Sequence, residues 1–256
     1  MHRPRKRFGQ HFLHDAGVIS DIVAAIAPDR QDTLIEIGPG HGAITGPLAR
    51  LAGSLHAVEF DRDLAASLRR QYADSRSVTI HEADALRFDF AALGSKLRIV
   101  GNLPYNISTP LLFHLVEFRD CIQDMHFMLQ KEVVDRMAAA PGSRDFGRLT
   151  VMLGCSMQVA HLFDVPPDAF QPPPKVMSAV VRLAPQPAGT YQIEDHALLK
   201  KIVAQAFTQR RKTIRNALRQ QASEAQLVAA GISPGARPEQ LAISQWIELA
   251  NLLHRA

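Results

Sequence analysis

The segment Gly101-Asn102-Leu103-Pro104-Tyr105 follows an apolar run and combines hydrogen-bond acceptors with an aromatic ring. Such a turn at the end of a strand can hold the exocyclic amine of adenine, which is a poor nucleophile because its lone pair is delocalised into the ring. The Asn102 side-chain oxygen and the Leu103 carbonyl can accept its two N–H bonds, while Tyr105 stacks on the base. Pro104 stiffens the turn because its ring fixes φ. Taken alone, the segment is equally compatible with an ordinary strand-to-loop turn.

A glycine-rich turn earlier in the chain predicts a binding site for a nucleoside cofactor. Gly38-Pro39-Gly40-His41-Gly42 follows the apolar run 33–37 and precedes a helical pattern. Glycines let the backbone approach a ligand at the carboxyl end of a strand, but a dinucleotide fingerprint would place its third glycine one residue later. Glu59 ends a second apolar run, where a ribose diol would need an acceptor, and Asp84 follows a third, where it could accept from an adenine amine. Each acid taken singly is more typical of a solvated loop, but together, in this order, the two favour a nucleoside cofactor.

Apolar runs alternate with helical patterns through about residue 140, which predicts a mainly parallel sheet with right-handed crossovers. Residues 125–130 are predicted as a further buried strand, and 155–165 with 178–183 as a late hairpin-like pair. The Pro- and Gly-rich segment 184–189 predicts a linker. We therefore expect a catalytic domain over 1–185 and a small helical domain over 190–256.

The chain resembles the S-adenosylmethionine-dependent methyltransferases and, more closely, the rRNA adenine dimethyltransferase family of the KsgA type. The matching segments occur in the family's order over nearly the whole chain, at residues 7–13, 36–40, 101–108, 125–132, 170–176 and 210–216. One departure is His11, where the family usually has Asn. An imidazole can still donate or accept a hydrogen bond, so cofactor contact there remains an expectation.

The resemblance implies a Rossmann-like α/β methyltransferase domain with a mixed, mainly parallel seven-stranded sheet, and a small all-α C-terminal domain. It implies S-adenosyl-L-methionine as cofactor, bound by His11, Leu13, Gly38, Gly40, Glu59, Asp84 and Asn102. It also implies catalytic roles for Asn102, Leu103, Tyr105 and Phe170, with Phe170 facing the target base opposite Tyr105. Extruding a base costs a few kcal/mol, which two flanking rings help to offset.

The implied reaction is the N6,N6-dimethylation of two adjacent adenosines in a hairpin loop near the 3′ end of 16S (small-subunit) rRNA. The expected partner is that rRNA in a pre-assembled ribosomal subunit. Two alternatives remain open. One is the related large-subunit rRNA adenine N6-methyltransferase, against which the 170–176 and 210–216 segments argue. The other is a ribosome-assembly or RNA-binding factor whose catalysis is secondary or lost.

The charge pattern agrees with a polyanionic partner. The net charge is +4, the pI is near 9.3, and no acid lies between Asp195 and Glu224. If that window is helical, Lys212, Arg215 and Arg219 share one face and Phe207, Ile214 and Leu218 form the buried side. The predicted RNA-binding residues are Arg5, Lys6, Arg7, Arg210, Arg211, Lys212, Arg215 and Arg219.

Other classes of site are not indicated. Glu59, Asp61 and Asp63 suggest a metal site less well than an N-cap, because Asp61 precedes a helical pattern starting near Arg62, so no metal is expected. The sequence has neither a nucleophile elbow nor a phosphate-binding P-loop. The two cysteines form no C-x-x-C pair, and no apolar run reaches membrane-spanning length. We expect a cytoplasmic monomer with no membrane partner.

Overall fold

The computed structural model describes residues 11–105 and 107–256, which form two compact units. The first unit contains the described residues up to Val134 and Ala160–Pro185, and the second contains Asp135–Val159 and Gln186–Ala256. The sequence-based boundaries kept residues 135–159 with the first domain, whereas by their contacts they group with the C-terminal helices. The physical reason is an apolar cluster in which Val151 is buried together with Leu199 and Trp246.

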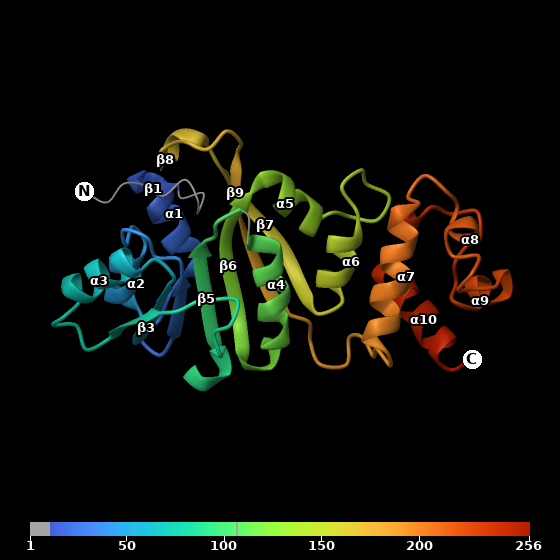
Figure 1. Cartoon of the computed structure of the whole chain (residues 1–256), viewed down its shortest axis with the longest axis horizontal. Coiled ribbons are helices and arrows are strands. Elements are labelled where there is room, and N and C mark those ends of the chain that lie inside the picture. The colour runs from blue at the N-terminus through green and yellow to red at the C-terminus, as the bar shows by residue number, and fades with distance from the viewer. Residues whose placement is uncertain (1–10, 106) are drawn as a thin grey trace. The chain divides into compact units, whose positions relative to one another are not determined.

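A seven-stranded sheet with the order β4-β3-β2-β5-β6-β9-β7 carries the first unit (Figure 1). Its strands are β2 (Thr33–Ile37), β3 (Ser54–Glu59), β4 (Val78–Glu82), β5 (Leu97–Asn102), β6 (Ile122–Gln130), β7 (Met157–Val165) and β9 (Ser178–Pro185). The strands from β4 to β6 are parallel, and β9 pairs antiparallel with β6. The mixed, mainly parallel seven-stranded sheet predicted from the sequence is thus confirmed.

The position of β2 in this order marks the place where a ligand is expected. Consecutive strands run outward from β2 in one direction through β3 and β4, and the order then resumes on its other side with β5. In open α/β sheets, ligands bind outside the carboxyl ends of the strands at such a switch point. A separate two-stranded ribbon joins β1 (Phe12–Leu13) to β8 (Phe170–Gln171).

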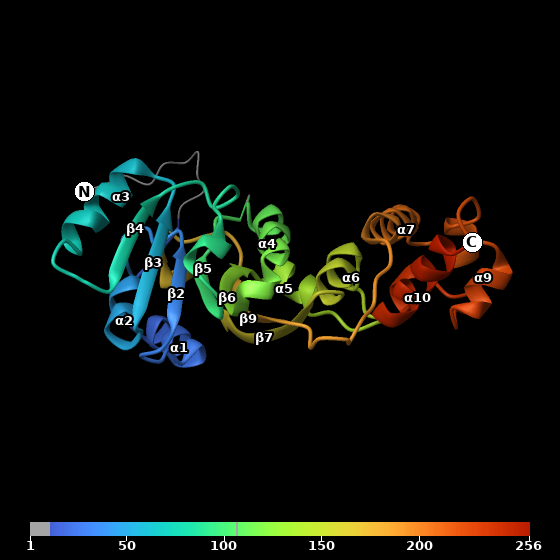
Figure 2. The ribbon, with the colours of Figure 1, turned by 90° about the horizontal axis from the view of Figure 1, so that it is seen from below.

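The helices of the first unit cover both faces of the sheet, with α1 on one face and α4 on the other (Figure 2). They are α1 (Ala16–Ile26), α2 (Thr45–Leu51), α3 (Arg62–Gln71), α4 (Ser108–Glu117) and α5 (Lys131–Met137), the last of which continues into the second unit. Helix α3 begins as predicted: the Asp61 side chain accepts hydrogen bonds from the backbone N–H groups of Asp63 and Leu64.

A buried ion network fastens α1 to the sheet. On β5, Arg98 donates from Nε to Asp124 of β6 at 2.9 Å and from Nη1 to Asp32 at 2.7 Å. Its remaining N–H groups reach the carbonyls of Ile26 and Ala27 at the end of α1. The last carbonyls of a helix have no partner within the helix, so this guanidinium satisfies them and fixes the position of α1.

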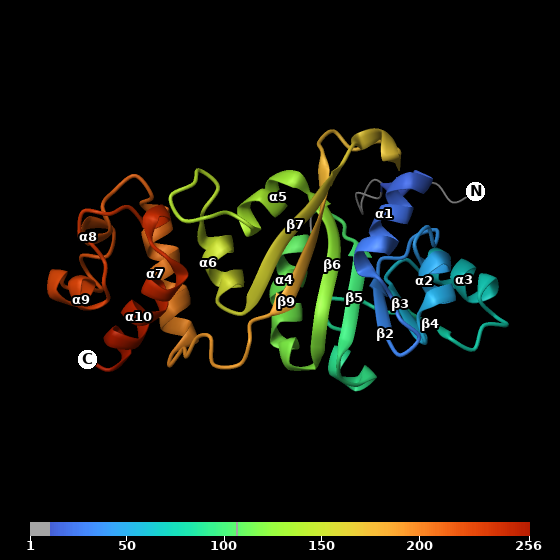
Figure 3. The ribbon, with the colours of Figure 1, turned by 180° about the vertical axis from the view of Figure 1, so that it is seen from behind.

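The second unit is helical (Figure 3). It contains α6 (Arg148–Gly154), α7 (His196–Thr208), α8 (Ile214–Ala217), α9 (Glu224–Ala229) and α10 (Ile243–His254). The predicted buried side is confirmed, because Ile214 and Leu218 are buried and Phe207 packs against their cluster. The single helix that would place Lys212, Arg215 and Arg219 on one face does not form. Helix α7 ends at Thr208 and α8 has only four residues, so Lys212 and Arg219 lie in turns on either side of it.

Within the part of the chain that the structure describes, no helix has both the length and the apolar character needed to cross a bilayer.

Candidate active site

The carboxyl ends of β2, β3, β4 and β5 border a cavity of about 380 Å³. The sequence-predicted residues that line it are His11, Leu13, Gly38, Gly40, Glu59, Asp84, Asn102, Leu103 and Tyr105. Parallel strands bring their carboxyl ends to one edge of a sheet, which is why residues that end or follow β2, β3, β4 and β5 meet here. Its size lies within the usual range of about 300–1,000 Å³ for small-molecule sites.

The glycine turn after β2 takes a backbone conformation that side chains disfavour. Gly38 has φ of 68° and Gly40 has φ of 59°, both in the left-handed region. A Cβ at Gly40 would also lie 3.2 Å from the ring of Phe12 in β1. The turn therefore needs glycine for two reasons, and it presents bare backbone to the cavity.

Two acids at the ends of β3 and β4 are held by backbone donors. Glu59 accepts from the N–H of Gly40 at 3.1 Å through Oε2 and from the N–H of Asp61 at 2.8 Å through Oε1. Burial raises the pKa of Glu59, and these backbone donors partly offset the rise. Asp84 accepts from the N–H of Leu86 at 3.0 Å through Oδ1. A carboxylate oxygen has more than one lone pair, so both acids keep acceptor capacity for a ligand.

The backbone of His11, the residue directly before β1, orients the side-chain amide of Asn102. Its Nδ2 donates to the carbonyl oxygen of His11 at 3.1 Å, and the Leu103 N–H donates to the carbonyl of Met128 at 3.2 Å. Because Nδ2 is engaged, the Oδ1 of Asn102 is the atom left to accept from a bound amine. The orientation of the proposed acceptor thus depends on residue 11 being docked.

The Tyr105 ring is held at both its hydroxyl and its face. The hydroxyl is 2.8 Å from the Oγ of Ser178, and the ring stacks on the imidazole of His11 at a centroid distance of 5.9 Å and 30°. The Nδ1 of His11 lies 2.7 Å from the carbonyl oxygen of Pro172. A carbonyl only accepts, so Nδ1 carries the hydrogen and donates it. His11 therefore ties the Pro-rich loop to the aromatic ring of the site.

Phe170 does not occupy the place expected of it. Phe170 is not one of the described residues that line the cavity, and it is only 1% exposed. It lies in β8, pairs with Leu13 of β1 and packs in a cluster with Ile22 and Val165. The ring that stacks on Tyr105 in this structure belongs to His11, and the sandwich of a base between Tyr105 and Phe170 stays a prediction.

Two buried ionisable groups lining the cavity carry strongly altered pKa values. Burial raises the pKa of Glu36 to about 7, partly offset by the Thr45 hydroxyl, which donates to it at 2.6 Å. Burial lowers the pKa of His126 to about 4. Neither ring nitrogen of His126 has a hydrogen-bond partner in the described part of the chain. Both groups are thus at least partly neutral near pH 7.

The predicted RNA-binding residues fall into three groups. Arg5, Lys6 and Arg7 lie outside the described residues. Arg210 is used internally, because it donates to the carbonyls of Ser143 and Arg144 and lies 3.7 Å from Glu239. Of the predicted residues, Arg211, Lys212, Arg215 and Arg219 are exposed in the second unit, and Arg215 lies 3.4 Å from Glu224.

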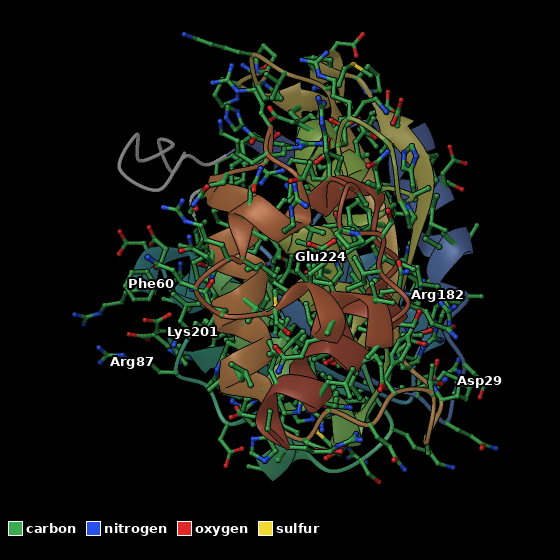
Figure 4. The ribbon with its side chains drawn as sticks, turned by 90° about the vertical axis from the view of Figure 1, so that its right-hand side faces the viewer. Asp29, Phe60, Arg87, Arg182, Lys201 and Glu224 are labelled. Carbon is green, nitrogen blue, oxygen red and sulfur yellow. The ribbon has the colours of Figure 1, made fainter. Side chains whose placement is uncertain are left out.

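Sequence reasoning missed three residues of the cavity. Glu36 and His126 lie within the family segments 36–40 and 125–132, but nothing in their local pattern shows that they are buried at the wall of the cavity. Phe60 also lines the cavity while being 61% exposed, and it projects from the surface in Figure 4. An aromatic directly after the strand-ending Glu59 was the available signal for it. Among the described residues, no cluster of three or more His, Cys, Asp or Glu side chains could hold a metal.

Comparisons with known proteins agree with this geometry. A model of the family "Ribosomal RNA adenine dimethylase" matches residues 1–255. "Ribosomal RNA small subunit methyltransferase A" of Aromatoleum aromaticum is 56% identical over 98% of this chain and 95% of its own length. The protein of that name from Chromobacterium violaceum is 55% identical, covering 99% and 97%.

Solved structures show the same fold. A dimethyladenosine transferase from Plasmodium falciparum has a TM-score of 0.81 at 23% identity, covering 93% of this chain and 96% of its own. The 23S rRNA methyltransferase ErmE has a TM-score of 0.74 at 26% identity, covering 95% and 99%. The resemblance inferred from the motifs is confirmed by the full-length family match and by relatives more than half identical. The chain belongs to the ribosomal RNA adenine dimethylase family.

Proposed function

We propose that this protein transfers methyl groups from S-adenosyl-L-methionine to N6 of two adjacent adenosines in a hairpin loop near the 3′ end of 16S rRNA. The product is N6,N6-dimethyladenosine, formed during ribosome biogenesis. The observation that carries the proposal is the fixed amide of Asn102, whose Oδ1 is left as an acceptor beside Tyr105 in a cavity bordered by the glycine turn. Relatives named for small-subunit rRNA methylation support the choice of substrate.

The chemistry of the cavity fits the cofactor. The turn at Gly38 and Gly40 gives close backbone approach, and a side chain at Gly40 would crowd Phe12. Glu59 would accept from the ribose hydroxyls and Asp84 from the adenine amine, while His11, Leu13 and Asn102 would border the remainder. When bound, the cofactor supplies a methyl group on a positively charged sulfur, so neither a metal nor a covalent nucleophile is required.

The chain's own share of the reaction is alignment and acceptance. Asn102 Oδ1 and the Leu103 carbonyl accept the N–H bonds of the target amine, which turns its lone pair out of the ring plane and stabilises the positive charge developing on nitrogen. The Leu103 peptide is held by its bond to Met128, and the Tyr105 ring by Ser178, so both are pre-organised. Phe170, being buried, acts by supporting the β1–β8 ribbon that carries His11 and Leu13.

The remaining contacts are assigned to the RNA backbone. The proposal gives Arg211, Lys212, Arg215 and Arg219 phosphate contacts, with Arg5, Lys6 and Arg7 in the same role. Phosphate contacts set position more than sequence choice, so the adenosine would be selected mainly at the cavity. The proposed substrate is rRNA within a pre-assembled small subunit, and the protein acts as a cytoplasmic monomer.

The test is to incubate the purified protein with radiolabelled S-adenosylmethionine and unmethylated small subunits, and then to digest the RNA to nucleosides. Label in N6,N6-dimethyladenosine supports the proposal. A parallel incubation uses large-subunit RNA, and label in that RNA alone would favour the activity named for ErmE, which shares this fold. The Asn102→Ala variant is expected to bind subunits while failing to transfer label. Tight binding without label by the unaltered protein would indicate an assembly factor.

A further inference from the structure

The loop between β8 and β9 displays a cation and two apolar side chains on the surface of the first unit (Figure 1). Lys175 is exposed, and the two residues that follow it, Val176 and Met177, are 46% and 38% exposed. None of the three is among the described residues that line the cavity. Exposed apolar side chains that occur side by side, rather than singly, are typical of a binding surface.

Both ends of this loop are fastened to aromatic rings of the candidate active site. At one end, the carbonyl oxygen of Pro172 accepts a hydrogen bond from His11 at 2.7 Å. At the other end, the Oγ of Ser178 lies 2.8 Å from the hydroxyl of Tyr105, on which the His11 ring stacks. Lys175 is three residues from either end, so its Cα lies within about 11 Å of the Cα atoms of both. The exposed residues are thus held beside the place proposed for the target base.

The loop is ordered before any ligand binds. Its first three residues, 172–174, are all proline, which fixes their φ angles. Near its other end, the carbonyl of Met177 accepts from the backbone N–H of Lys131 at 2.9 Å. A surface that is already fixed loses little conformational entropy when a partner docks on it.

The charge of Lys175 is available to an anion from outside the chain, because it has no ion-pair partner among the described residues. The ammonium group of Lys131, by contrast, lies 3.1 Å from Asp164, which also lies 2.9 Å from the ring of His161. A cation next to two exposed apolar side chains matches a nucleotide, which carries both a phosphate and a base. An inorganic anion would use the cation alone, and an apolar peptide would use only the other two residues.

We propose that Lys175, Val176 and Met177 bind the RNA nucleotide next to the target adenosine, with the ammonium group on its phosphate and the apolar pair against its base. The inference rests on the proposed function, because the RNA strand that delivers a base to Tyr105 must pass this loop. Where two adjacent adenosines are modified, the contact holds the second one at the edge of the cavity while the first is inside it.

The first experiment measures binding of the full-length protein to unmethylated small subunits between about 50 and 200 mM KCl at constant Mg²⁺. Lys175→Gln should weaken binding about fivefold at about 0.1 M salt and reduce the slope of log affinity against log salt by about 0.7, the value for one single-strand phosphate. Lys96→Gln is the matched control, because Lys96 is an exposed lysine directly before β5, at the opposite end of that strand from Asn102. It should leave the slope unchanged.

The second experiment locates the contact by crosslinking. Lys175→Cys is labelled with an aryl azide, bound to small subunits and irradiated, and the crosslinked nucleotide is found where reverse transcription stops. The unaltered protein, labelled in the same way, reports any crosslinks from Cys121 and Cys155, and Lys96→Cys is the matched control. Crosslinks specific to Lys175→Cys should lie within a few nucleotides of the adenosines that acquire methyl groups. Crosslinks only to other RNA segments or to a ribosomal protein would overturn the inference, as would an unchanged salt slope in folded Lys175→Gln.

Methyl transfer to the same subunits separates this inference from the proposed function. Transfer by the unaltered protein, with no change of salt slope in Lys175→Gln, would mean that the contact fails and the proposed function stands. A reduced slope and crosslinks in the hairpin loop, without transfer, would mean the reverse. The contact is made equally before and during transfer, so Lys175→Gln should raise KM for the subunit and leave kcat nearly unchanged. A lower kcat at unchanged KM would contradict a docking role.

Discussion

Glu36 should make the first unit less stable as the pH rises from 4.5 to about 7. Its side chain is buried at the end of β2, and its pKa is raised from 4.5 to about 7. Between these values the unfolded chain releases the proton while the folded chain keeps it, so the free energy of unfolding falls as pH increases. The loss is complete above pH 7 and corresponds to about 3 kcal/mol, at about 1.36 kcal/mol for each pH unit between the two pKa values.

The substitution Glu36→Gln isolates this effect. The Gln side chain keeps an oxygen that can accept from the Thr45 hydroxyl, now 2.6 Å from Glu36, but it cannot ionise. The variant should therefore match the unaltered protein below pH 4.5 and exceed its stability by about 3 kcal/mol above pH 7.

Urea unfolding followed by far-UV circular dichroism across that pH range measures the difference. Trp246 is the single tryptophan and lies in the second unit, so its fluorescence reports the unit that the substitution does not touch. If the stabilities of the two proteins keep a constant difference from below pH 4.5 to above pH 7, then Glu36 is not held neutral by burial and the reasoning is refuted.

Four further predictions address individual residues. The unaltered protein should lose stability as the pH falls from 6.5 to about 4, because the folded state resists protonating the buried His126 ring. His126→Met should remove this loss. Acid titrations of both proteins by circular dichroism would coincide if His126 played no part. Tyr105→Ala should reduce transition-state stabilisation, measured from kcat/KM, by about 1–3 kcal/mol because stacking is lost. Tyr105→Phe should lose only the bond to Ser178 and keep most activity. Equal activities of the two variants in a methyl-transfer assay would argue against stacking. Phe170→Ala should lower the free energy of unfolding in urea by about 3–5 kcal/mol, because removing a buried ring leaves a cavity. A normal stability with a lower kcat/KM would instead favour a direct role of Phe170 at the base. Gly40→Ala should weaken the affinity for the cofactor, measured by calorimetry. Gly189→Ala should not, because Gly189 also has a positive φ but has open space around it and is remote in sequence. Equal affinities of the two variants would contradict the close fit around Phe12.

The sheet was predictable because its determinants are local. Each of the parallel strands β2 to β5 is a short run that ends at, or directly before, Gly, Glu or Asn, and the alternation with helices implies that these ends meet at one edge. The cap at Asp61 was predictable for the same reason, since it depends on the next three residues. The lining of the cavity by Glu59, Asp84 and Asn102 followed from this arrangement.

The features that the sequence could not reveal depend on contacts between distant segments. Phe170 is buried because β8 pairs with β1, whose residues lie more than 150 positions earlier, and no pattern around Phe170 records that pairing. Arg210 resembles its basic neighbours in sequence but is used by the carbonyls of Ser143 and Arg144. The helical period that placed Lys212 and Arg219 on one face assumed a helix that the packing of the second unit ends at Thr208.

The bond from Asn102 Nδ2 to the His11 carbonyl makes the proposed acceptor for the target amine depend on a ribbon of two residues per strand. Opening of that ribbon releases the amide to rotate, so the catalytic geometry exists only in the fraction of molecules in which β1 is docked. Local opening of this kind acts as a common multiplier, because it scales the turnover of every substrate by the same closed fraction. The Phe170 side chain of β8 does not line the cavity. Changes in β8 should therefore lower kcat without altering the choice of base. The ribbon sets how often the enzyme is competent, and the cavity sets what it acts on.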